Sequence, residues 1–159
     1  MTKEASISIA DLDVRTASET PFEFEYLLAD GKGSGVFLQV LGAHSKTVQT
    51  ETNRLVNDRR SAEAQREAMQ IGIGAPAFTP VEDDIAFGQR LAAVRLVGWR
   101  GPGKTEGLTA EQVERFQGVK EPWSADLALK LCRSNPPLSE QVTKRSATLG
   151  NFTPTSAAP

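Results

Sequence analysis

The sequence predicts an α+β fold, in which a small N-terminal antiparallel sheet of two to three strands precedes a long polar helix, a core helix and three short C-terminal helices. Aromatic residues alternate with glutamates over 22–26, which is the period of a half-buried strand. A Gly-rich turn at 29–35 and an apolar run at 36–41 complete the pattern of an antiparallel hairpin. Helix caps and helical apolar spacing then dominate the chain to residue 149.

Length and composition predict one domain with polar ends. The chain has 159 residues, a net charge of −2 and a single cysteine and histidine. This charge argues against a nucleic-acid binder, and no apolar run approaches the roughly 18 residues of a membrane span. No signal peptide, disulfide or metal cluster is expected, which favours a soluble cytoplasmic protein. The expected divisions are an acidic, partly disordered leader over 1–20, a single α+β domain over 21–152 with its sheet in 21–42 and its helical part in 45–152, and a disordered tail over 153–159.

The predicted hairpin needs a further element, because a lone hairpin is marginal in water. Alternating serines and isoleucines favour a short strand around 6–10, which could supply the third strand. Alternatively, the helix that follows the hairpin in the sequence could pack against it.

The predicted long helix covers 46–69 and begins at the N-cap Ser45. Its apolar residues are few and its charges alternate in sign, so most of it is expected to be solvated, loosely held or partner-facing. We therefore take Arg59 and Arg66 as candidate partner-binding residues. Reversing both charges is expected to weaken partner binding with little effect on thermal stability.

The predicted core helix covers 79–97, where Thr79, Pro80 and Glu82 form a helix-start signature and the apolar arc is wide. A loop then covers 98–108.

Three short helices are expected after this loop. Thr109 opens the first, which carries Phe116, Ser124 caps the second over 125–133, and the third covers 137–149 with Gly150 as its C′ residue.

A string beginning at Gly98 and ending with Gly103, Lys104 and Thr105 fits the P-loop pattern G-x-x-x-x-G-K-T. Its surroundings favour a structural loop. The preceding segment has the pattern of a capped helix, Gly107 interrupts the helix that should follow, and the remaining 54 residues show helical patterns. We treat the match as a decoy, with no cofactor expected.

No catalytic constellation stands out among the other side chains. His44 is expected in a turn and Cys132 on a buried helix face, and the neighbouring acids Asp83 and Asp84 do not converge on a helix. Trp99 and Phe116 are candidate partner anchors, because aromatic residues are favoured at the centres of interfaces.

Three segments carry a distinctive pattern by their order and spacing. Residues 35–60 comprise a strand, a Gly-x-x-Ser turn and a charged helix, and 91–101 comprise a helix that leads into a Trp-x-Gly loop. Residues 122–152 contain Pro-Trp-Ser, then Pro-x-Leu-x-x-Gln-Val, then Asn-Phe. Over 22–152 the chain thereby resembles the tail assembly chaperones of long-tailed bacteriophages.

The resemblance implies a non-enzymatic protein of the infected host's cytoplasm. Such proteins keep the tape measure protein soluble and bring the major tail protein, which forms the tail tube, to it. No cofactor, metal, nucleic acid or membrane is implied, and self-association is open. A minor structural protein of the tail or connector is the alternative function, and a P-loop nucleotide-binding protein is the less favoured one.

Overall fold

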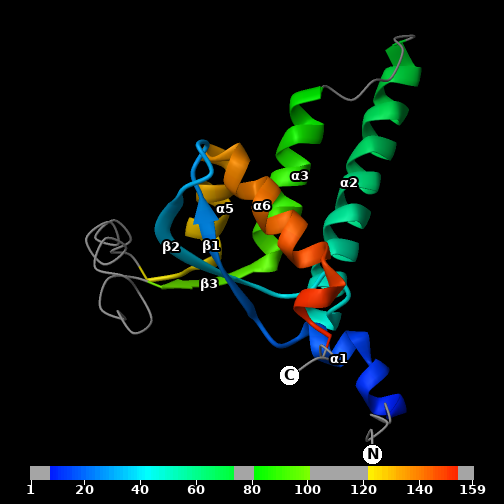
Figure 1. The fold of residues 1–159 in the computed structure, drawn as a ribbon. Helices are drawn as coiled ribbons and strands as arrows, with labels where there is room; N and C mark the ends of the chain where they lie inside the picture. The colour runs from blue at the N-terminus through cyan, green and yellow to red at the C-terminus, as the bar shows by residue number, and fades with distance from the viewer. Residues whose placement is uncertain (1–7, 74–80, 101–121, 154–159) are drawn as a thin grey trace, which may run out of the picture.

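The computed structural model describes residues 8–73, 81–100 and 122–153, and it confirms the α+β class. A three-stranded antiparallel sheet is packed against helices, and a long helix follows the first two strands (Figure 1). The described elements are η1 (Ile9–Leu12), α1 (Val14–Ser18), β1 (Phe22–Leu27), β2 (Gly33–Val40), α2 (Lys46–Ile73), α3 (Val81–Arg95), β3 (Leu96–Arg100), α5 (Ala125–Ser134), α6 (Pro136–Ala147) and η3 (Leu149–Asn151).

The sheet has the order β1-β2-β3, and its third strand comes from a place that the sequence did not predict. The helix expected to reach residue 97 ends at Arg95, and Leu96–Arg100 pairs with β2. Leu38 lies opposite both Phe24 and Trp99, and these residues belong to the core or pack against it. The apolar segment after Arg95 is therefore used to widen the sheet, which gives the hairpin its third strand.

The strand expected around 6–10 is absent from residues 8–10, and helical turns occupy this place. Ser8 accepts a hydrogen bond from the backbone of Ala10, and Asp11 accepts one from the backbone of Ser8. Asp13 in turn caps α1 through the backbone and hydroxyl of Thr16. These short polar side chains satisfy helix-start N–H groups, so the local hydrogen bonds override the alternating pattern.

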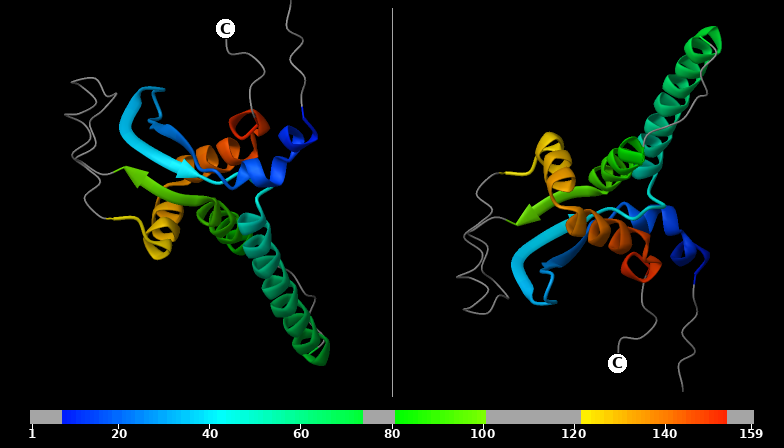
Figure 2. Two further views of the ribbon diagram at one scale, coloured as in Figure 1. Left: turned by 90° about the horizontal axis from the view of Figure 1, so that it is seen from below. Right: turned by 90° about the horizontal axis from the view of Figure 1, so that it is seen from above.

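α2 has 28 residues and is about 42 Å long at 1.5 Å per residue. Ser45 caps it as predicted, accepting a hydrogen bond from the Val48 N–H at 3.1 Å. Among its described side chains, Val48 is the only buried one. Figure 2 shows the consequence, since α2 projects well away from the sheet and from α5 and α6. The thin apolar stripe of the sequence therefore corresponds to a helix held to the body mainly at its start.

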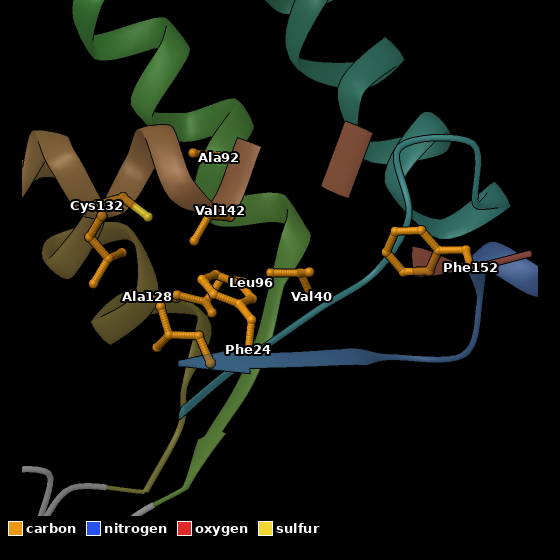
Figure 3. Close-up of a cluster of buried hydrophobic side chains, with 10 residues drawn as sticks. Phe24, Val40, Ala92, Leu96, Ala128, Cys132, Val142 and Phe152 are labelled. Atoms are coloured by element: carbon orange, nitrogen blue, oxygen red, sulfur yellow. The ribbon is translucent and has the colours of Figure 1, made fainter. Parts of the chain in front are cut away.

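The core lies between the sheet and the helices α3, α5 and α6 (Figure 3). The prediction of α3 as the core helix holds for its C-terminal end, where Ala92 is fully buried. Ile85, nearer its start, is 56% exposed. Phe152 lies at one side of the cluster and meets the ring of Phe22 edge-on. The buried residues of the cluster are Phe24, Leu38, Val40, Ala92, Leu96, Ala128, Cys132, Leu138, Val142 and Phe152.

The C-terminal helices largely follow the sequence. Ser124 caps α5 as predicted, through the backbone N–H of Leu127. α6 ends at Ala147, so the prediction of Gly150 as its C′ residue is wrong, and Gly150 lies in η3. Phe152 follows η3 directly, and its side chain is buried in the core. The start signature at 79–80 and the helix expected from Thr109 lie outside the described residues.

Candidate partner-binding site

A groove of about 650 Å³ lies along α2, α3 and the start of α5. In both views of Figure 2, α3 lies between α2 and α5. All three helices contribute lining residues, and we refer to the α3 side of the groove as its floor and to the α2 and α5 sides as its walls. We call it the α2–α3 groove. Its lining residues are Glu51, Arg54, Leu55, Asp58, Arg59, Ala62, Glu63 and Arg66 of α2, Asp83, Ala86, Phe87, Arg90, Ala93 and Val94 of α3, and Ala125, Asp126 and Leu129 of α5.

Arg59 links the two long helices at this groove. Its guanidinium forms an ion pair with Asp84 of α3 and a second one with Glu63 of α2, whose Oε1 lies 3.1 Å from Nε. The same guanidinium lies 4.6 Å from the ring centroid of Phe87, in cation–π geometry. The hydrogen bonds with Asp84 and Glu63 raise the pKa of Arg59, so it remains a cation.

Arg66 makes a second link further along the same helices. Its Nη1 lies 3.6 Å from Oδ2 of Asp83. Arg59 and Arg66 are seven residues apart, or two helical turns, so they lie on one face of α2. In the sequence, Asp83 and Asp84 stand out only as neighbouring acids. In the structure each acid instead receives its own arginine from α2.

These contacts give the two arginines a structural role, while their expected part in partner binding stays a prediction. They were expected on a solvated or partner-facing surface, and the Arg59 side chain is only 28% exposed. Its partners lie on its own helix and on α3, so Arg59 contributes to the spacing of α2 and α3. The residues that sequence reasoning missed are Asp84 and Phe87, whose contacts with Arg59 span 25 and 28 positions in the chain.

Arg54 of α2 forms ion pairs within its own helix. It lies 3.0 Å from Glu51 and 3.0 Å from Asp58, one turn to either side of it, so two carboxylates share one guanidinium. Arg90 of α3 and Asp126 of α5 form no ion pair with another described residue, and both are exposed. Arg90 and Asp126 are therefore the charged lining residues without an ion-pair partner among the described residues.

Of the two candidate aromatic anchors, Trp99 is not part of this groove. Trp99 lies on β3 opposite Leu38, is half-buried and packs against the core. Trp123 is 38% exposed, and its Nε1 donates a hydrogen bond to the carbonyl of Leu96 at 3.1 Å. Phe116 lies outside the described residues. The structure thus separates Trp99 from the two candidate arginines.

The P-loop-like string begins inside a strand. Gly98 is a buried residue of β3 opposite Gln39, and a Cβ at this position would collide with the Gln39 side chain. In a P-loop the glycine-rich segment follows its strand. The helix expected before the string is wrong for residues 96 and 97, and the loop expected over 98–108 is wrong for residues 98–100, because all five belong to β3. Gly103, Lys104 and Thr105 lie outside the described residues.

The remaining reactive side chains occupy the positions expected of them. His44 lies in the turn before α2 and is exposed. Cys132 is fully buried on α5, and burial raises the pKa of its thiol. Within residues 8–73, 81–100 and 122–153, no three His, Cys, Asp or Glu side chains are grouped so as to hold a metal ion.

Comparison with protein-family models, with curated proteins and with solved structures finds no match to this chain. Of the helices in the described ranges, none has both the length and the apolar character needed to cross a membrane.

Proposed function

We propose that this protein is a tail assembly chaperone of a long-tailed bacteriophage. It would act in the cytoplasm of the host bacterium without catalysing a reaction, bind the tape measure protein and bring the major tail protein to it. The resemblance of three ordered segments over 22–152 motivates the proposal. The observation that carries it structurally is α2, a 28-residue helix that leaves the body with Val48 as its only buried side chain among those described.

Several residues of these three segments have defined positions in the fold. Ser45 of the first segment is the buried N-cap of α2. Ala92 of the second segment is fully buried, as is Ala128 of the third. Phe152 ends the third segment and closes one side of the core. A protein with the same three segments would therefore have the same helix cap and the same buried residues. This supports using the pattern of the segments to propose the family of this chain.

The exposed helix suits an assembly factor because such a protein must bind and then release its partner. A large, dry, apolar interface would hold the partner permanently. The α2–α3 groove combines half-buried apolar side chains, such as Leu55 and Phe87, with a charged rim. Polar rims around small apolar centres are typical of interfaces that form and dissociate.

The proposal is tested by co-expressing the chain, carrying an affinity tag, with the tape measure protein of the same phage. We expect the two proteins to co-purify. An unrelated tagged protein of similar size and charge serves as the control. Retention of the tape measure protein by the control alone, or by neither protein, would reject the proposal.

The alternative function is that of a minor structural protein of the tail or connector. Mass spectrometry of purified particles distinguishes the two functions. A chaperone is expected to be absent from finished particles. Stoichiometric amounts in the particle would instead favour the structural role.

A further inference from the structure

We infer that the α2–α3 groove binds one amphipathic helix of a partner protein, laid on α3 between α2 and α5. This inference rests on the proposed function, because it assigns the helix to the tape measure protein. The lining residues of α2 recur every three to four positions, as in Leu55, Asp58, Ala62 and Arg66. Those of α3 recur in the same way from Asp83 to Val94. Each helix thus presents one continuous stripe to the groove, and the site is elongated.

Apolar side chains line the groove on all three helices. They are Leu55 of α2, Phe87 and Val94 of α3, and Leu129 of α5, and each residue is half-buried. A helix with apolar residues at i, i+3 or i+4, and i+7 would cover these side chains, which is the usual way in which a helix occupies a groove. Because the lining residues of α3 run from Asp83 to Val94, the floor extends over about 17 Å, or about three helical turns of the occupant.

Charge further restricts the occupant. Arg54 is neutralised by Glu51 and Asp58 on its own helix. Arg90 on the floor and Asp126 on the α5 wall have no ion-pair partner among the described residues. A complementary helix would therefore carry an acidic residue near Arg90 and a basic residue near Asp126, flanking its apolar stripe.

A second copy of this chain is a poor occupant. Among the described helices, the exposed large apolar side chains are Met69 and Ile71 on α2, Ile85 on α3, Ile9 and Leu12 on the short η1, and Leu149 on the short η3. Residues two apart, such as Met69 and Ile71, lie on different faces of a helix. No described helix therefore presents the continuous exposed stripe that the groove requires, which favours a helix of another protein as the occupant.

The test compares how fast a maleimide labels two matched cysteine variants of α2, with and without the partner bound. Ala62→Cys places a thiol in the groove, whereas Ala64→Cys places one on the same exposed helix, two residues further along and outside the groove. Cys132 is fully buried, so a maleimide will modify the introduced thiol first. Each variant of the full chain is labelled alone and in its co-purified complex with the tape measure protein. We expect the complex to slow labelling of Ala62→Cys about tenfold or more and to leave Ala64→Cys nearly unchanged.

The outcomes separate the inference from the proposed function. Failure of the unmodified chain to co-purify rejects the proposed function and the assigned occupant together. Co-purification with equal labelling of the two variants in the complex rejects the groove alone. Protection of Ala62→Cys that appears in the isolated chain as its concentration rises would identify a second copy as the occupant and would also overturn the inference.

A charge variant gives an independent check on the same surface. Arg90→Glu removes the positive side chain of the floor, and we expect it to weaken the complex several-fold. Arg60→Glu, at an exposed position outside the groove, is the matched control and should leave the complex unchanged. Equal affinities for Arg90→Glu and the unmodified chain would contradict the assigned charge pattern.

Discussion

The side-chain amide of Gln141 on α6 is hydrogen-bonded to both backbone groups of Leu27 at the end of β1. Nε2 donates to the Leu27 carbonyl at 2.8 Å, and the Leu27 N–H donates to Oε1 at 2.9 Å. β1 is an edge strand of the described sheet, so no strand in the described part of the chain pairs with these two backbone groups on that side. Gln141 thus replaces the missing strand at one position and fastens the last long helix to the first strand.

Replacing Gln141 should destabilise the fold. Gln141→Ala leaves the partly buried donor and acceptor of Leu27 without this partner, which we expect to lower the free energy of unfolding by about 1 to 3 kcal/mol. Urea denaturation measures the change. Thr143→Ala, at an exposed position on the same helix, is the control and should stay within about 0.5 kcal/mol of the parent. Equal effects of the two substitutions would mean that the amide contributes nothing.

The buried cap of α2 should also contribute to stability. Ser45→Ala removes the acceptor for the Val48 N–H, and we expect a loss of about 1 kcal/mol in the free energy of unfolding. Ser61→Ala, in the exposed middle of the same helix, should have little effect. Denaturation of both variants side by side tests the difference, and a Ser45→Ala variant as stable as Ser61→Ala would refute the capping role.

Stability should depend on pH through Glu19. The Thr47 backbone N–H and hydroxyl donate hydrogen bonds to its carboxylate and lower its pKa in the folded chain. Because the pKa is lower when folded, the stabilisation is complete above the unfolded value of about 4.3 and is lost as the pH falls below it. We expect wild type to be more stable than Glu19→Gln at pH 7, with the difference shrinking toward pH 3. Urea midpoints measured across this range test the prediction, which a pH-independent difference would contradict.

Reversing the charge of Arg59 should loosen the distal part of α2 without unfolding the protein. Arg59→Glu would place a carboxylate beside Asp84 and Glu63. We expect hydrogen exchange of the backbone amides over 61–72 to quicken several-fold, because a contact that holds this part of α2 to α3 is lost. The melting temperature should change little, since Val48 is the only buried side chain described in α2.

Arg60→Glu is the control for this experiment, because Arg60 is exposed and forms no ion pair with a described residue. Identical exchange in the two variants would show that the contact of Arg59 with α3 is unimportant. A large fall in the melting temperature of Arg59→Glu would instead place α2 in the core.

The parts of the fold that were predicted from the sequence depend on local chemistry. Ser45 and Ser124 cap the helices that follow them because each hydroxyl contacts a backbone N–H only three residues away. The hairpin of β1 and β2 is likewise a contact between neighbouring segments, with a glycine-rich turn at positive φ for Gly31 and Gly35.

The parts that were missed depend on distant partners. Leu96–Arg100 follows α3 directly and becomes a strand because it meets β2, which lies more than 50 residues earlier. The same is true at the candidate site, where Arg59 is paired with Asp84 across two helices. Alternating charges on one helix do not reveal such a partner, so sequence reasoning expected a solvated or partner-facing surface.

The most direct test of the central proposal is the soluble fraction of the tape measure protein when it is expressed alone and together with this chain. The account predicts that the tape measure protein is mostly insoluble alone and becomes largely soluble with the chain. An unrelated protein expressed at the same level should not have this effect. An equal soluble fraction with and without the chain would contradict the proposal that it is a tail assembly chaperone.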